Sequence, residues 1–453
     1  FPPEQREIVN NEINVEQDIA QLNISRDENQ NYSEPCQEDR ILILSNKITG
    51  SINLCGAKID EVFLKDFKTS TKEESDYVQF FNPKENDNAF WVESGWKAPK
   101  NIRYNLPGNN TLWTLEEGQT LTPDTPVVIS WNNDNGLIFK QKISIDENYV
   151  FNIKQEIINN SPGSITVFPF QQLSRKEAPD GQALGLLHEG PTGYFDEELE
   201  EIDYDDIEDN DFRSEFKEGW VGIRDKYWAT AITSLDKDNK RAIFKTSTDA
   251  FDNFYRIGYI GDLTGASSGE SVSSVSLAFI GAKEVKIIQE YSDNNTFNRL
   301  DLIIDWGWFY FLAKPLFYVL DILFSFSGNF GVAILLLTIL IKVVFFPVVN
   351  RSYVQMAKMR KVQPEITKLR ELYGDDRQKM ALEMQSLYKK EELKPLSGCL
   401  PVLIQIPVFF ALYNVLLVAL EMRHAPFIGW IKDLSAPDPI SLFNGFGLIN
   451  WEP

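Results

Sequence analysis

The chain has 453 residues, of which 44 are basic and 66 are acidic, giving a formal net charge of -22. At roughly 100 to 200 residues per domain, this length predicts two or three structural units. A net charge this negative argues against direct recognition of nucleic acid, because the phosphates would be repelled.

Residues 1–38 are polar and poor in aromatic side chains. They bury too little apolar surface to offset the entropy of ordering, so we predict a polar tether. No cleavable signal peptide is visible, and we expect any export signal or first anchoring helix either to have been removed or to lie upstream of residue 1. Three cysteines, Cys36, Cys55 and Cys399, make no disulfide framework. A Cys36–Cys55 bridge requires an oxidising compartment and suitable geometry, and the sequence leaves that pairing open.

Residues 39–292 alternate β-branched or aromatic runs with turn-forming clusters such as 132–136 and 159–163. This pattern predicts antiparallel hairpins that together build a large β-sandwich. A short helix is expected near residues 283–291. The strands predicted in this part are Ile41–Leu44, Ser51–Leu54, Pro126–Trp131, Leu137–Ile145, Tyr149–Ile157, Ser164–Leu173, Trp220–Leu235, Arg241–Thr246, Phe254–Tyr259 and Val272–Ile280.

The run from Phe195 to Glu218 is dense in Asp and Glu. A metal site is conceivable there, but the acids lack the Gly and Asn spacing of a calcium-binding loop. We therefore favour a solvated surface insertion and expect no metal.

Residues 300–327 are strongly aromatic, but they also contain Asp305, Lys314, Asp321 and Pro315. Trp and Tyr favour the headgroup level of a bilayer, so the pattern predicts an interfacial amphipathic helix. A second buried span is the alternative.

Residues 330–349 are apolar except for Thr338 and Lys342. At about 1.5 Å per residue they reach about 30 Å, which matches the hydrocarbon core and predicts a transmembrane helix. Residues 399–420 form a second predicted span, with Gln405 as a polar inclusion and Pro401 and Pro407 as kinks.

The intervening segment reverses the charge of the chain. Residues 351–394 carry eleven basic and seven acidic side chains, a net +4, which leaves -26 on the remainder. Lys and Arg accumulate in short cytoplasmic segments beside spans, so we place this segment in the cytoplasm. Its helical periodicity, interrupted at 374–376, predicts a helical hairpin over residues 350–396. Its methionines suit adaptable contact with apolar substrates, although methionines on a helical stripe more often serve simple packing: Met356, Met359, Met380 and Met384.

Lys342 lies about two-thirds of the way along the first span. A charge near the bilayer centre costs about 2.5 to 3.5 kcal/mol on insertion scales, so such residues usually face a cavity or a partner. A lysine can instead extend its stem toward the interface. Position alone leaves both interpretations open.

Several sequence blocks point to one family. They are YVQMAKMR at Tyr353–Arg360, Gln363-Pro364, Gly374-Asp375-Asp376, LKPLSGCLPVLIQIPVFFALY at Leu393–Tyr413, Glu421–Phe427 and Trp430–Ser435. Over roughly residues 300–440 this combination closely resembles the YidC family of membrane protein insertases of Gram-negative bacteria, part of the YidC/Oxa/Alb group.

The resemblance implies a periplasmic domain with a galactose-mutarotase-like β-supersandwich and an α-helical core in the inner membrane. It also implies an anchoring helix upstream and further spans downstream, so we expect residues 421–453 to be a periplasmic segment of an incomplete core. The family usually has Arg inside a hydrophilic groove at the position of Lys342. Lysine keeps the charge but loses the planar bidentate fork.

The function implied by the resemblance is insertion of nascent membrane proteins into the lipid bilayer, without a cofactor or a catalytic residue. The expected groove residues are Lys342, Thr338 and Gln405, although ordinary helix packing explains Thr338 and Gln405 about as well. The cytoplasmic hairpin would receive substrates near the ribosome.

The two alternative functions are an enzyme and a docking scaffold. An enzyme would need a positioned acid and base, and the chain has only His188 and His424 and none of the common catalytic motifs. We therefore predict no enzyme activity. The second alternative is a periplasmic docking scaffold for the Sec translocon without its own insertion activity, in which a buried cation has little use.

Overall fold

The computed structural model describes residues 39–178, 187–249, 252–374, 376–391 and 400–436 of the chain. These residues divide into two compact units, Phe1–Ile304 and Asp305–Pro453, and each is described by itself.

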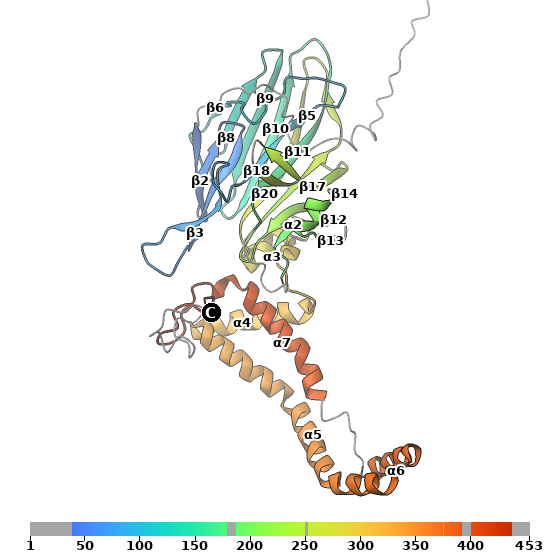
Figure 1. Cartoon of the computed structure of the whole chain (residues 1–453). Coiled ribbons are helices and arrows are strands. Elements are labelled where there is room, and N and C mark those ends of the chain that lie inside the picture. Colours follow the sequence, from blue (N-terminus) through green and yellow to red (C-terminus); the bar gives the residue numbers. More distant parts are fainter. Residues whose placement is uncertain (1–38, 179–186, 250–251, 375, 392–399, 437–453) are drawn as a thin grey trace, which may run out of the picture. The chain divides into compact units, whose positions relative to one another are not determined.

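The first unit contains two β-sheets (Figure 1). The 11-stranded sheet has the order β14-β17-β18-β11-β5-β3-β2-β1-β7, with β19 beside β11 and β4 beside β3. All its strand pairs are antiparallel except the short β1–β7 pair. Its strands are β1 (Arg40–Leu44), β2 (Ile48–Asn53), β3 (Lys58–Lys68), β4 (Tyr77–Phe81), β5 (Phe90–Lys97), β7 (Thr120–Leu121), β11 (Ile165–Arg175), β14 (Phe212–Phe216), β17 (Lys240–Asp249), β18 (Asp252–Gly261) and β19 (Thr264–Ala266).

The 9-stranded sheet is antiparallel throughout, with the order β13-β12-β15-β16-β20-β10-β9-β8-β6. Its strands are β6 (Thr114–Glu117), β8 (Val127–Asn132), β9 (Leu137–Ile145), β10 (Val150–Asn159), β12 (Gly190–Phe195), β13 (Glu198–Glu201), β15 (Gly219–Arg224), β16 (Trp228–Ser234) and β20 (Ser271–Ala282). The predicted antiparallel sandwich is confirmed.

Strand β9 shows how alternation produces this fold. Its odd-numbered residues, including Phe139 and Ile143, are buried, while the residues between them are more exposed. The predicted turn before it is present, because Asn133 Oδ1 accepts hydrogen bonds from the backbone N–H groups of Asn135 and Leu137. Gly136 adopts φ 90°, a conformation that glycine takes without strain. The two sheets also contact directly, since Gln141 Nε2 on β9 donates to Ser94 O on β5 at 3.2 Å.

The structure contains several strands that were not predicted: β3, β4, β6, β7, β12 and β19. Three further features differ from the prediction. The run Trp220–Leu235 is two strands, β15 and β16, that pair as a hairpin. Strand β5 was missed because all of its residues are buried, so it has no polar alternation to detect. The acidic run is not a plain surface insertion: it builds β13, the helix α2 (Tyr204–Asp209) and β14, which pair with or pack beside the sheets.

Helix α3 (Val285–Asp293) and the 3-10 turn η1 (Leu300–Ile303) complete the first unit. The predicted short helix near 283–291 corresponds to α3. Cys55 is disulfide-bonded. Cys36, whose pairing with Cys55 the sequence left open, lies outside the described residues, as do Cys399 and the predicted tether.

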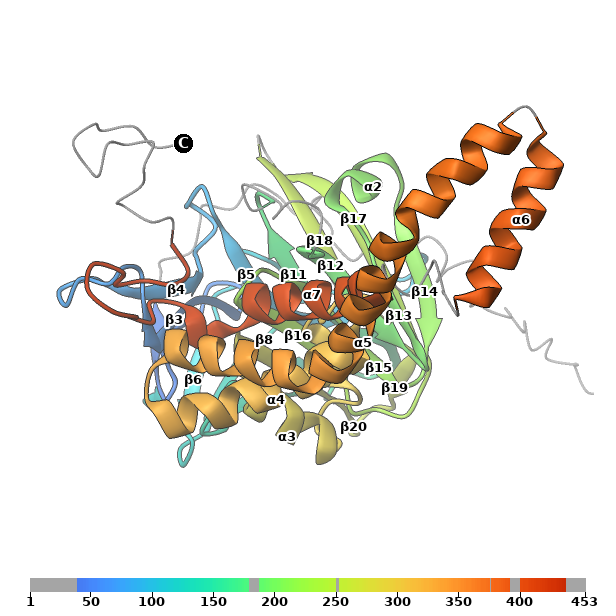
Figure 2. The same ribbon diagram turned by 90° about the horizontal axis from the view of Figure 1, so that it is seen from below.

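The second unit is helical. It comprises α4 (Tyr310–Ser327), α5 (Phe330–Tyr373), α6 (Arg377–Lys390), α7 (Leu400–Val418) and the 3-10 turn η3 (Leu420–Met422). Helices α4, α5 and α7 lie side by side (Figure 1 and Figure 2). Helix α5 has 44 residues and at about 1.5 Å per residue is about 66 Å long, so it continues well past the predicted span.

Candidate functional site

Three helices of the second unit have the length and hydropathy needed to cross a membrane: α4, α5 and α7. Large apolar side chains on α5 and α7 face away from the protein, including Val343, which is 64 % exposed, and Phe409. Just before α4, Trp308 is 95 % exposed. Exposure of so large an apolar surface to water would be strongly unfavourable, so these helices are suited to contact with lipid. The interfacial position of α4 stays a prediction.

Lys342 lies on the side of α5 that does not pack. Ala333 and Leu337 are the fully buried residues of this part of the helix. Lys342 follows Ala333 by nine residues, and at about 100° per residue this places it on the opposite side of α5. Lys342 is accordingly exposed, and it makes no ion pair within the described parts of the chain.

Thr338 lies one turn before Lys342 on the same face. Its hydroxyl donates to Ile334 O at 2.9 Å, the usual way in which a threonine satisfies itself within an apolar helix. Thr338 and Lys342 therefore form a polar stripe between exposed apolar neighbours such as Ile339.

Gln405 is exposed on α7, near Pro407. Helices α5 and α7 contact each other within the second unit. Among the residues that the structure describes, Gln405 makes no hydrogen bond with Lys342 or Thr338. The structure thus brings Thr338 and Lys342 together on one helix and leaves Gln405 on a second, adjacent one.

The predicted cytoplasmic hairpin is formed by the C-terminal part of α5 and by α6. Val362, Ile366 and Leu387 make a small buried core between them. The turn ends with Asp376, whose side chain caps α6 by accepting from Lys379 N at 3.1 Å, as the sequence predicted. Gly374 ends α5, although in a right-handed conformation rather than the left-handed one common at helix ends.

The four methionines of the hairpin fall into two pairs. Met359 and Met384 pack against the buried core of the hairpin, so packing accounts for them. Met356 is exposed and Met380 half-exposed, and neither belongs to that core.

The beginning of α5 is held by residues that the sequence analysis missed. Asn329 caps the helix by accepting from Val332 N at 3.1 Å, and its amide donates to Pro426 O and Phe427 O at 3.3 and 2.9 Å. A Cβ at Gly331 would collide with the Phe427 ring, so glycine allows this close approach. The only available signal was Asn329 itself, a preferred N-cap residue directly before an apolar run.

A similar contact fixes α7 against the entrance to α4. Asn414 Nδ2 donates to Trp306 O at 3.2 Å, and Gly307, at φ 69°, leaves room for that amide. These bonds connect the start of α5 to the segment after α7, and α7 to the entrance of α4, and they pair the polar groups at these contacts.

Comparison with known proteins identifies the family. The family described as the YidC periplasmic domain matches residues 40–319, and that described as 60Kd inner membrane protein matches residues 322–449. Membrane protein insertase YidC of Rickettsia bellii is 41% identical over 420 residues, covering 92% of this chain and 75% of that protein. The chain belongs to the YidC family of membrane protein insertases. It is an inner-membrane protein with a periplasmic domain, as predicted.

Further relatives in the family have the same name. Those of Nitrobacter hamburgensis and Brucella melitensis are 42% and 43% identical, and the alignments cover 91% of this chain and 70% and 68% of those proteins. The insertase function is therefore that of the family, and nothing favours a scaffold without insertion activity. The substrates of this family are membrane proteins, and its members act in the lipid bilayer.

Solved structures similar to the first unit share little sequence with it. A galactose mutarotase related enzyme from Lactobacillus acidophilus has a TM-score of 0.38 at 13% identity, covering 53% of this chain and 97% of that chain. A putative aldose 1-epimerase from Escherichia coli K12 has a TM-score of 0.37 at 9% identity, covering 54% and 99%.

Proposed function

We propose that this insertase moves substrate helices from the cytoplasm into the inner membrane along the face of α5 that carries Thr338 and Lys342. The ammonium of Lys342 attracts the acidic polar end of the substrate, while the apolar helix of the substrate leaves into lipid. The observation that carries this proposal is the exposed position of Lys342 on an otherwise apolar stretch of helix.

The energetics favour a wet groove over direct contact with lipid. Lys342 lies twelve residues after the start of α5, about 18 Å along the helix. A cation in hydrocarbon at such a depth costs about 2.5 to 3.5 kcal/mol on insertion scales. Water held by Thr338 and Gln405 would lower this cost, and the same water would hydrate the polar end of a substrate during its passage.

The exposed methionines of the hairpin suit the first contact with a substrate. Met356 and Met380 are flexible, polarisable and outside the hairpin core, so they can adapt to varied apolar segments. We assign the hairpin a receiving role at the cytoplasmic side, near the ribosome, and we propose that the protein acts alone or with the Sec translocon. No covalent chemistry is required, and we propose no enzyme activity.

The test uses the complete protein reconstituted in liposomes and scores protease-protected insertion of single-span substrates with acidic or neutral tails. Lys342→Arg keeps the charge and is expected to insert both. Lys342→Ala is expected to lose about tenfold in insertion of acidic tails, equivalent to about 1.4 kcal/mol, and to keep neutral tails. Lys142→Ala, which removes an exposed lysine on β9 of the first unit, is the matched control. Normal insertion of acidic tails by Lys342→Ala would contradict the proposal.

A further inference from the structure

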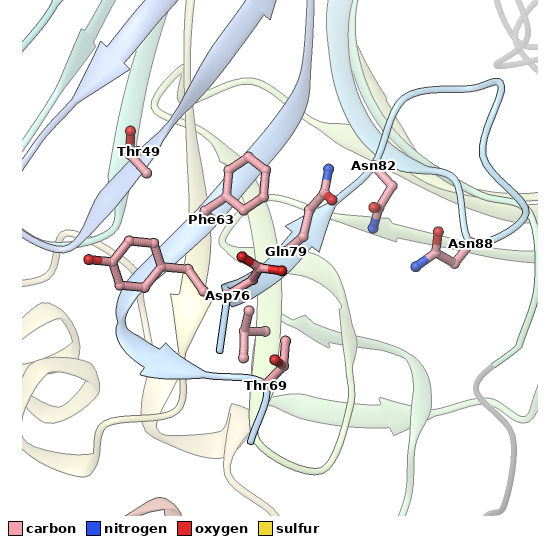
Figure 3. A pocket seen from close by; sticks show the side chains of 9 residues that line it. Thr49, Phe63, Thr69, Asp76, Gln79, Asn82 and Asn88 are labelled. Carbon is pink, nitrogen blue, oxygen red and sulfur yellow. The ribbon is translucent and has the colours of Figure 1, made fainter. Parts of the chain in front are cut away.

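A pocket of about 640 Å³ lies on the first unit, where β2, β3 and β4 meet the loop that follows β4 (Figure 3). The strand register places Thr49 opposite Phe63 and Phe63 opposite Gln79, so these three side chains share one face of the sheet. The volume lies within the range of about 300 to 1,000 Å³ that is common for small-molecule sites. The lining residues are Thr49, Phe63, Thr69, Asp76, Tyr77, Val78, Gln79, Asn82 and Asn88.

Asn82 is the residue that marks this pocket as a binding site. It is only 4 % exposed, yet its side-chain amide makes no hydrogen bond with any described residue. Buried amides in folded proteins are nearly always paired, because an unpaired one loses its hydration without compensation. The amide of Asn82 lines the pocket, so a ligand or water in the pocket is the partner available to it.

The other polar groups define the chemistry of the ligand. Gln79 and Asn88 add two more carboxamides, each with both donors and acceptors, and Asp76 adds an acceptor. Within the described parts of the chain, none of these three side chains makes a hydrogen bond. Hydroxyl groups, which donate and accept at once, are the complement of such a set.

Two aromatic rings complete the pocket. Phe63 and the exposed ring of Tyr77 provide apolar faces next to the carboxamides. An aromatic face packs well on a flat patch of C–H groups, while the polar neighbours bind the hydroxyl groups at its edge. A pyranose ring has both features.

Other ligand classes fit less well. The lining contains no Lys, Arg or His, so a phosphate, sulfate or lipid headgroup would find no cationic donor. One carboxylate is too few for a bare metal ion. Val78 is the one aliphatic lining residue, which gives the side chains of an apolar peptide little to bury against.

We propose that this pocket binds a neutral oligosaccharide, held by the carboxamides of Gln79, Asn82 and Asn88 and stacked on Phe63 or Tyr77. The inference is independent of the insertion mechanism, because it rests on the first unit alone. It gives the periplasmic domain a recognition function of its own, directed at glycans on that side of the membrane.

The test uses the complete protein in phospholipid nanodiscs, because alkyl glycoside detergents would compete for the site. Maltotriose, cellotriose and chitotriose are titrated by calorimetry and by saturation-transfer NMR. At least one is expected to bind, and Gln79→Ala and Tyr77→Ala are each expected to weaken its affinity about tenfold or more. Gln119→Ala, another exposed glutamine outside the pocket, is the matched control and should bind as the unchanged protein does.

Asn82→Asp preserves the size of the buried side chain and replaces its donor by an acceptor, so it is expected to alter affinity for the same sugar. Because Tyr77 and Gln79 are not buried, their variants decide the matter even if an Asn82 variant misfolds. The proposal is overturned if no trisaccharide binds at about 10 mM, or if binding survives Gln79→Ala and Tyr77→Ala unchanged. It is also overturned if a sulfated oligosaccharide or an unglycosylated peptide binds at this pocket instead.

Discussion

His188 shows at the residue scale how burial changes the chemistry of a side chain in the first unit. Its Nε2 lies 3.0 Å from Pro191 O, and the backbone O of His188 accepts from the buried Arg224. Burial, and then the charge of Arg224, lower the pKa of His188 below its usual value. The hydrogen bond to Pro191 O and the charges of Glu201 and Asp203 oppose this only in part.

We therefore expect the first unit to lose stability on acidification. The unfolded chain binds a proton at His188 near pH 6.5, whereas the folded state does so only at lower pH, so the unfolded state binds more protons and stability falls as pH drops through about 6.5. Hydrogen exchange of β12 and β15 in the complete protein, compared at about pH 7.5 and 5.5, measures this. His188→Gln should reduce the difference and His424→Gln should not.

An increase in stability on acidification would mean that the ion pair with Asp203, at 3.4 Å, outweighs burial. Asp203 is largely exposed, so water screens that pair, which is why we expect burial to dominate.

The face on which Lys342 lies could not be read from the sequence. The apolar run from 330 to 349 predicted a span, but its residues are apolar on all sides and indicate no packed face. Only the packing of Ala333 and Leu337 shows that Lys342 faces outward and that Thr338 lies half-buried one turn before it. Asn329, by contrast, was detectable as an N-cap, although its bonds to the segment after α7 were not.

At the scale of elements, the hairpin of α5 and α6 depends on a very small core. Leu387→Ala should cost about 2 to 3 kcal/mol, the low end for buried leucines, because Leu387 is 9 % exposed and its core has few members. Hydrogen exchange in α6 should accelerate while that of β9 and β10 stays unchanged. Leu382→Ala on the same helix, 66 % exposed, should change exchange little. Equal effects of the two substitutions would show that the hairpin core is not what holds α6.

Strands and helices were predictable from the sequence where one face is buried and the other is exposed to solvent. Strand β9 alternates between core and surface, and its limits were predicted correctly. Strand β5 is buried on both faces and shows no alternation. The acidic run concealed β13, α2 and β14, because their surface charges outnumber the few residues that they bury, such as Tyr204 and Ile207.

At the scale of the whole molecule, basic and acidic residues are distributed unequally between the two units. The basic segment 351–394 lies within the helical unit, and the acidic remainder includes the periplasmic domain. This is the arrangement that the positive-inside tendency produces. Strand pattern, charge and hydropathy were therefore sufficient to predict a β domain followed by membrane helices, while the pocket beside β4 depends on strand register and could be found only in the structure.

The most direct test of substrate guidance by Lys342 reverses the charge of this residue and compares substrates of opposite charge. The complete protein with Lys342→Glu is reconstituted and supplied with two single-span substrates that differ only in whether the translocated tail is acidic or basic. We predict that Lys342→Glu inserts the acidic tail at least about tenfold less well than the unchanged protein and inserts the basic tail better. Equal losses for both tails, or no loss for either, would contradict the claim that the charge of Lys342 guides the substrate.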